Sequence, residues 1–230
     1  GLDSFPLLAV PLFIFAGAIM QHSGIAHALV DLIQSIVGRL RGSLGAVTIL
    51  TSAAFGILTG SCMATISCIG GIMIPEMKKK GYSDAYCSAL AAASSFLGIL
   101  IPPSVPGIMY GLCAGVSISA VWLSTVGPAI CCIILFMLIN YFRQGRREEK
   151  VTTPFVLSTY AGNVGKTFIR AIPALIMPVI IFGGIYGGIF TATEAGAVSG
   201  LYAIILGFLI KRKMNARQLW STFTDTGYQM

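Results

Sequence analysis

Side chains that can bind ions and small polar molecules gather in two uncharged segments of this 230-residue chain. The first segment is Gly42–Pro75, and the residues near its middle are small or carry hydroxyls: Gly60, Ser61, Thr65 and Ser67. The second is Ala85–Ala114, whose middle is similar: Ser94, Ser95, Gly98, Pro102 and Ser104. Hydroxyl and carbonyl oxygens suit a hard cation such as Na⁺, whereas N–H groups at interrupted helices suit anionic groups.

Prolines interrupt the second segment. Pro102, Pro103 and Pro106 lie within five residues of one another. Proline has no N–H, and its ring clashes with the carbonyl four residues earlier, so a helix cannot continue through this cluster. The sequence therefore predicts one membrane helix that is broken near its middle, with backbone carbonyls freed at the break.

Composition places these segments in a membrane. Hydrophobic residues make up 56% of the chain and charged residues only 10%, whereas a soluble domain carries about 25% charged residues. Apolar and polar residues do not alternate, which excludes a transmembrane barrel. We therefore predict an all-α integral membrane protein, a polytopic helical bundle with a proline-broken helix.

The formal net charge of +7 comes from clusters that border apolar runs: Arg39/Arg41, Lys78–Lys80, Arg143–Lys150, Lys166/Arg170 and Lys211–Lys213. Cations at the ends of membrane segments mark the cytoplasmic side. This placement excludes a basic face for nucleic acid and indicates a lipid bilayer as the surroundings.

The length of Gly42–Pro75 decides how it enters the membrane. Its 34 residues would make a helix of about 50 Å, whereas the hydrocarbon core is about 30 Å thick. Cations flank both ends, which places both ends on the cytoplasmic side. We therefore predict a re-entrant hairpin over residues 42–77 that turns at Thr59–Ser61. One long bent span and two short full spans are the alternatives.

The rest of the chain divides around this hairpin. Residues 1–41 hold a first span, Pro6–Met20, and an amphipathic interfacial helix, Ile25–Leu40, which is alternatively an extension of that span. Residues 84–114 form the broken helix. Residues 115–150 hold the span Ile118–Phe142 and a basic cytoplasmic loop.

Residues 151–230 begin with a linker or second amphipathic helix, Thr152–Lys166. Two spans, Phe168–Phe190 and Ala195–Ile210, and an amphipathic piece, Ala216–Tyr228, follow. Thr191 or Thr193 is expected to cap the second of these spans. Glu194 is then a helix-start carboxylate, or alternatively a polar contact in a gate.

Catalytic and cofactor motifs are absent from the sequence. The six cysteines form no Cys-x-x-Cys pair, and both histidines are far from them, which argues against a metal centre or a disulfide framework. No Ser/His/Asp arrangement, His-Glu-x-x-His or phosphate loop is evident, so we expect no enzyme and no cofactor. The chain does not begin with Met, and we expect it to be part of a longer protein.

The two interrupted segments are expected to form one site. The Na⁺ ligands would come from Gly60, Ser61, Ser94, Ser95, Gly98 and Pro102. The substrate would contact Ser61, Thr65, Ser67 and Ser104. Glycine and serine in membrane helices also serve close packing, which is the simpler interpretation of any one of these residues.

Four motifs together resemble the large membrane subunit of TRAP transporters, the DctM-like family. They are Leu2–Phe13, Gly60-Ser61 leading to Ile74-Pro75-Glu76-Met77, Ala92–Ser95 leading to Ile101-Pro102-Pro103-Ser104, and Gly187–Ala195. The resemblance covers essentially the whole chain. Two positions differ from many members: Thr65 stands where they have Asp, and Ala192 where they have Pro.

This resemblance implies Na⁺-driven uptake of carboxylates such as C4-dicarboxylates or sialic acid across the bacterial inner membrane. It implies two partners, a small membrane subunit and a periplasmic substrate-binding protein. It also implies an elevator-type transporter built as an inverted repeat, of which this chain holds one half and the start of the other. A channel or a non-transporting membrane scaffold is the alternative function.

Overall fold

The computed structural model describes residues 8–145, 157–207, 222 and 224. Within these residues the chain forms helices and no strand, which confirms the all-α prediction. Two of the helices are long and apolar enough to cross a membrane, and two bent helix pairs raise that number to as many as four. Several predicted segments lie outside the described residues, apart from isolated positions: the basic loop at 146–150, the start of the predicted linker, Lys211–Lys213 and Ala216–Tyr228.

The first two helices are separate elements. α1 (Ala9–His22) ends at Ser23, and Gly24 adopts a left-handed φ of 74° before α2 (Ile25–Val37) begins. α2 buries one apolar face and exposes Asp31 and Gln34 on the other. The helix is amphipathic, as predicted; whether it lies apart from the first span or extends it stays open, since α1 and α2 together are long and apolar enough for one bent span. Its position in the membrane interface stays a prediction.

The uncharged run forms a hairpin, as predicted. α3 (Ser43–Thr59) is followed by α4 (Cys62–Thr65), a π-helical turn (Ile66–Gly70) and α5 (Gly71–Lys79). The Thr48 hydroxyl contacts the Met77 sulfur at 3.7 Å, so the start of the first arm lies beside the end of the second. This contact rules out one long bent span. The second arm continues past Pro75, with the wider π turn just before it.

The next segment is broken where the prolines predict. α6 (Asp84–Ser95) and the short α7 (Leu97–Leu100) lead to Ile101–Ser104, and α8 (Val105–Ala114) resumes beyond it. The two parts are bent by 43°. Two consecutive prolines remove the N–H groups that the ladder needs here.

Three more helices complete the described bundle: α9 (Ile118–Arg143), α10 (Leu157–Tyr186) and α11 (Ala192–Ile205). The sequence suggested that a linker or a separate amphipathic helix precedes the span within 151–190, but Leu157–Lys166 belongs to the same helix as that span. α10 lies along α2, and just after this stretch Ser35 and Thr167 share a 2.9 Å hydrogen bond between their hydroxyls.

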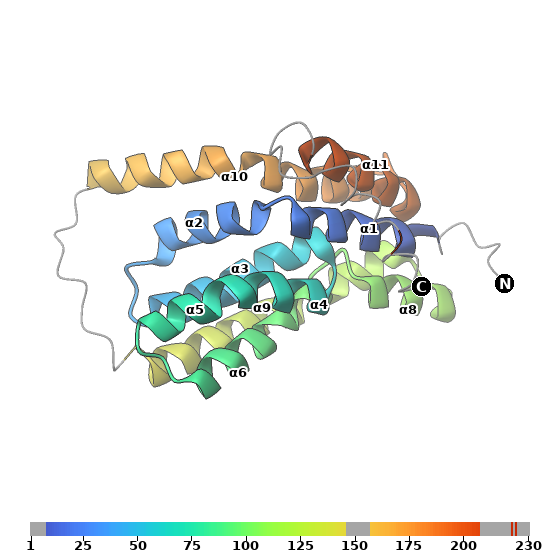
Figure 1. The fold of residues 1–230 in the computed structure, drawn as a ribbon. Coiled ribbons are helices and arrows are strands. Elements are labelled where there is room, and N and C mark those ends of the chain that lie inside the picture. Colours follow the sequence, from blue (N-terminus) through green and yellow to red (C-terminus); the bar gives the residue numbers. More distant parts are fainter. Residues whose placement is uncertain (1–7, 146–156, 208–221, 223, 225–230) are drawn as a thin grey trace.

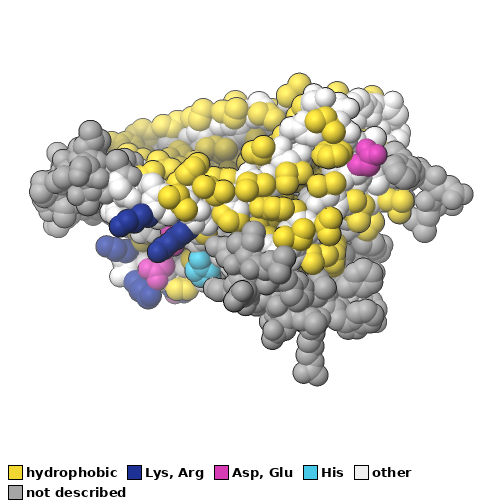
Figure 2. Space-filling model, turned by 90° about the horizontal axis from the view of Figure 1, so that it is seen from above, with side chains coloured by type: hydrophobic (Ala, Val, Ile, Leu, Met, Phe, Trp, Pro, Cys, Tyr) yellow, Lys and Arg dark blue, Asp and Glu magenta, His cyan; other side chains and the backbone are white. Residues whose placement is uncertain are grey.

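Basic side chains gather at one end of the bundle, as the placement of Lys and Arg clusters in the sequence predicts. α2 and α5 end there, and α3, α6 and α10 begin there (Figure 1). The Lys and Arg side chains visible in Figure 2 lie toward that same end. The hairpin therefore returns to the end at which it starts, which is the arrangement that the positive-inside rule predicts.

The described helices pack as two groups. In the α1 group, α1 packs on α11, and α10 packs on both α2 and α11. In the hairpin group, the hairpin (α3–α5), the broken helix (α6–α8) and α9 pack on one another. Most contacts between the two groups come from α3, which lies against α1 and α2.

Asn140 ties the hairpin group together at its basic end. This α9 residue is only 1% exposed. Its Nδ2 donates to the Gly42 carbonyl at 2.8 Å, and its Oδ1 accepts from the Tyr86 hydroxyl at 2.9 Å. One amide thus holds the base of the hairpin and the first part of the broken helix against α9. Sequence reasoning did not single it out.

We expect Asn140→Leu to destabilise the protein. It removes two hydrogen bonds, one to the Gly42 carbonyl, which keeps its 3.1 Å bond from the Ala46 N–H, and one to the half-buried Tyr86 hydroxyl, and each such bond is worth about 0.5–1.5 kcal/mol. Tyr86→Phe removes only one of the two bonds and should cost less. The measurement is the thermal unfolding midpoint of the purified full-length protein in detergent. Asn163→Leu, on the exposed surface of α10, is the control, and an equal effect of both Asn variants would contradict the role of Asn140.

Candidate functional site

The tip of the hairpin lies against the break in the second segment. Gly60 has a left-handed φ of 59°, and a Cβ added there would overlap the Pro103 carbonyl oxygen. α8 extends for ten residues beyond this contact, which is about 15 Å of helix. The tip is therefore well short of the far end of the bundle. This geometry supports a re-entrant hairpin and argues against two short full spans.

A second contact joins the two segments beside the tip. A Cβ added to Gly98 would lie 2.5 Å from the Thr65 hydroxyl and 2.8 Å from the Ser61 carbonyl oxygen. Only a residue without a side chain allows the hairpin to approach α7 so closely. Oxygen atoms of the hairpin thus lie directly against the end of the broken helix.

After both interruptions the next helix begins with the same local structure, a serine N-cap. Ser61 has extended backbone angles, and its hydroxyl accepts from the Ala64 N–H at 3.3 Å. Ser104 does the same with the Gly107 N–H at 3.2 Å. Serine is a preferred N-cap because its side chain satisfies a helix-start donor. The carbonyl of Ser104 also accepts from the buried Trp122 indole at 3.2 Å, so Ser104 is buried and engaged within the protein.

Three other predicted residues are engaged within the protein, two of them between the hairpin and the broken helix. The Thr65 hydroxyl is buried and donates within the hairpin to the Ser61 carbonyl at 2.8 Å. Ser94 accepts from the Ser52 hydroxyl at 3.2 Å, and Ser95 lies 3.1 Å from the Cys62 sulfur. In this arrangement the hydroxyls of Ser94 and Ser95 make packing contacts between the two segments.

The tip also lines a pocket of about 310 Å³, which it shares with α1. Ser61 and Ser67 line it together, whereas Thr65 and Ser104 do not. Thr59, which the sequence placed in the predicted turn but not among the ligands, lines it as well, and so do Gly17 and Gln21, which sequence reasoning missed. Gln21 carried one usable signal, because it is a polar residue at the end of the first apolar run. The predicted substrate residues therefore divide into two that face a pocket and two that are buried.

The Na⁺ site built from the predicted ligands stays a prediction, and oxygen atoms are what those residues offer. Pro102 and Pro103 have no N–H to donate to the carbonyls of Gly98 and Ile99, four residues earlier. The Ser61 carbonyl and the Thr65 hydroxyl lie next to Gly98. Among the described residues, no group of three or more His, Cys, Asp or Glu side chains is placed to hold a metal ion.

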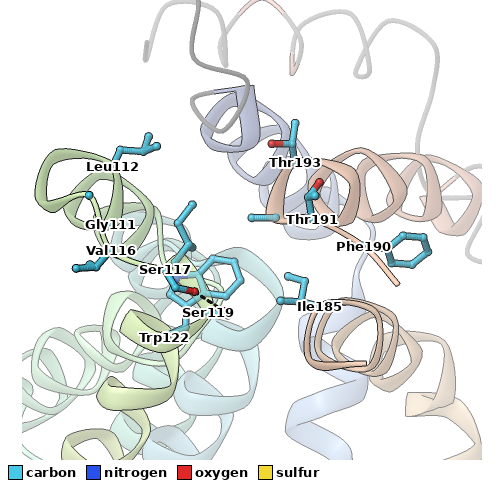
Figure 3. A pocket seen from close by; sticks show the side chains of 13 residues that line it. Gly111, Leu112, Val116, Ser117, Ser119, Trp122, Ile185, Phe190, Thr191 and Thr193 are labelled. Carbon is cyan, nitrogen blue, oxygen red and sulfur yellow. Dashed lines mark hydrogen bonds between the residues drawn. The ribbon is translucent and has the colours of Figure 1, made fainter. Parts of the chain in front are cut away.

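A larger pocket, of about 470 Å³, lies elsewhere. It lies between the α8–α9 connection and the α10–α11 connection (Figure 3). Ser117, Ser119 and Trp122 line one side, and Thr191 and Thr193 line the other. None of the predicted site residues lines it. Its volume exceeds that of the tip pocket, but it lies at the end away from the basic side chains and holds no interrupted helix at its centre.

Glu194 has the structural role that the sequence favoured. Its carboxylate accepts from the Thr191 N–H at 2.8 Å and from the Thr191 hydroxyl at 2.9 Å. In return, the Thr191 hydroxyl accepts from the Glu194 N–H at 3.3 Å, which completes a capping box. Thr191, rather than Thr193, is therefore the cap of α11.

By its fold, the chain is an all-α, multi-pass membrane protein with a helical hairpin seated on a broken helix. A family model described as "Tripartite ATP-independent periplasmic transporter, DctM component" matches residues 1–229. The chain belongs to this family of transporter permease subunits, which are not enzymes. This confirms the resemblance found in the sequence.

Individual relatives agree with the family. The chain is 39% identical over 210 residues to the sialic acid TRAP transporter large permease protein SiaM of Vibrio cholerae, covering 91% of this chain and 48% of that protein. It is 36% identical over 227 residues to the ectoine/5-hydroxyectoine permease UehC of Ruegeria pomeroyi, covering 99% and 52%. It is 39% identical to the uncharacterized protein YgiK of Salmonella typhimurium, covering 98% and 51%. The chain thus spans about half the length of these curated relatives.

We expect Gly98→Ala to separate the hairpin from the broken helix. The added methyl would overlap a backbone carbonyl that cannot move aside, and overpacking of this kind costs about 1–3 kcal/mol. Thermal unfolding of the full-length protein measures this cost. Gly165→Ala, on the exposed side of α10 with no atom near its added methyl, should be neutral or slightly stabilising. Equal stability of the two variants would show that the Gly98 contact is loose.

Proposed function

We propose that the complete protein is the membrane permease subunit of a Na⁺-coupled secondary transporter that takes up carboxylates. The observation that carries this proposal is the contact of the hairpin tip with the helix break at Gly60–Pro103 and Gly98–Ser61. Two interrupted helices that meet inside an apolar bundle expose carbonyl oxygens and N–H groups where no water competes. Family membership supports transport as the use of that site.

Sodium is the proposed coupling ion because the oxygens at this site are neutral. Hydroxyls and carbonyls from the hairpin and the broken helix surround the tip, and no carboxylate lines the adjoining pocket. A proton relay would require a titratable group at this depth. A hard cation such as Na⁺ needs only oxygen ligands.

Relatives support the proposed substrate class, although one is named for isethionate, a sulfonate, and the family supports the proposed partners. Relatives are named for sialic acid and for 2,3-diketo-L-gulonate, which are both carboxylates. We infer that a periplasmic binding protein delivers such a substrate, and that a small membrane subunit completes the transporter in the bacterial inner membrane. One relative is named as a DctMQ permease protein, a name that joins the large subunit with a second component, which supports the proposal of a second membrane subunit.

Movement of one helix group against the other would give alternating access. The hairpin group contains both interrupted segments and is tied together by Asn140 and the Ser52–Ser94 bond. It contacts the α1 group mainly through α3. We propose that the hairpin group carries the site as one body, in an elevator-type movement.

Uptake should require Na⁺. We expect proteoliposomes with the complete permease, its small subunit and its loaded binding protein to accumulate labelled carboxylate only with an inward Na⁺ gradient. Uptake that is equal with K⁺ in place of Na⁺ would disprove the coupling. Conductance without the binding protein would favour the channel alternative.

Ser61→Ala should weaken that uptake and raise the Na⁺ concentration needed for half-maximal rate by about tenfold. The variant removes a hydroxyl that faces the tip pocket and caps α4, and such a bond is worth about 0.5–1.5 kcal/mol. The control is Ser124→Ala, an exposed serine of α9. Unchanged Na⁺ dependence in Ser61→Ala would remove this residue from the site. Ser104→Ala should also weaken uptake, but with a loss of stability, because Ser104 caps α8 in the interior.

A further inference from the structure

The pocket at the hairpin tip lies on the boundary between the two helix groups. Thr59, Ser61 and Ser67 line it from the hairpin group, and Gly17 and Gln21 line it from α1. A ligand in this pocket would therefore touch both groups at once. The sequence motifs pointed only to the hairpin and the broken helix, so the contribution of α1 is additional to them.

The approach of α1 to the tip is fixed at Gly17. A Cβ added there would lie 2.9 Å from the Thr59 carbonyl oxygen and 3.0 Å from the Thr59 Cα. Both atoms belong to the backbone at the end of α3, so neither can rotate away. Both residues line the pocket, so this close contact lies at its wall.

Gln21 lies one helical turn after Gly17 on the same face of α1. Of the α1 residues that line the pocket, Gln21 is the one with a polar side chain. Its amide offers both a donor and an acceptor. Across the pocket, Ser61 and Ser67 offer hydroxyls. Among the described residues, none that lines this pocket is charged.

We propose that Gln21 contacts the substrate and helps to determine its specificity. This inference rests on the proposed function. The amide would hydrogen-bond a hydroxyl, amide or carboxylate oxygen of a small polar substrate held at the hairpin tip. Because Gln21 belongs to the α1 group, it makes this bond only when the hairpin group lies where the structure places it, and the bond is lost when the groups move apart.

The test is direct binding to the complete permease with its small subunit, purified in detergent with Na⁺. The binding protein is omitted, because its own affinity would mask that of the permease. The probes are sialic acid, 2,3-diketogulonate, ectoine and succinate. We expect Gln21→Leu to raise the dissociation constant of the bound probe about threefold to tenfold, the range for one neutral hydrogen bond. Gln34→Leu, on the exposed face of α2, should leave it unchanged.

Gln21→Glu separates contact with substrate from a merely structural role. The two side chains have the same shape, but the carboxylate repels an anionic probe. We expect a dissociation constant above that of Gln21→Leu at neutral pH, which falls toward the wild-type value as the pH is lowered and the new carboxyl group is protonated. A structural role would give no such pH dependence.

The outcomes are distinct. Equal affinities of wild type, Gln21→Leu and Gln21→Glu would overturn the role of Gln21 and leave the proposed function in place. Failure of the wild-type complex to bind any of the probes, with or without Na⁺, would overturn the proposed carboxylate function and this inference with it.

Discussion

Backbone polar groups away from water must find partners inside the protein, and this constraint governs the centre of the molecule. Two helices stop inside the bundle, one at Gly60 and one at Ile101–Ser104. Each restarts with a serine that caps the next helix, and each lies against the other. The interruptions are tolerated because they meet. Neither would be stable facing lipid, since unsatisfied carbonyl and N–H groups are costly there.

Small residues make that meeting possible, and the rest of the hairpin group holds it in place. Gly60 and Gly98 let backbone approach backbone. The Ser52–Ser94 and Cys62–Ser95 contacts join the arms of the hairpin to α6. Asn140 fixes the base of both segments to α9. Polar side chains that look like ligands in the sequence thus do two kinds of work: some face the pocket, and others hold the interrupted helices together.

The sequence predicted the elements better than the site. Charge and length were sufficient for the hairpin, because cations at both ends of Gly42–Pro75 and a 34-residue run allow few other paths. Proline chemistry located the break at Pro102–Pro103. The division of the site residues was not predictable, because the direction of Thr65 and Ser104 depends on caps and contacts that form only in the folded bundle. Gln21, Thr59 and Asn140 were missed for a similar reason, since their partners are far away in the chain. Leu157–Lys166, which the sequence left as a linker or a separate helix, is the first part of α10.

The Asn140 bonds also bear on how the protein is made. The Gly42 carbonyl lies 98 residues before the amide that it accepts from, so the base of the hairpin reaches the membrane long before α9 is synthesised. The Tyr86 hydroxyl, which donates to the same amide, also precedes it in the chain. Conversely, α9 enters the bilayer with a polar side chain that finds its partners only in segments already inserted. The two bonds of Asn140 can therefore form only after α9 has been synthesised, so the tie between the hairpin, the broken helix and α9 depends on the last of these segments in the chain.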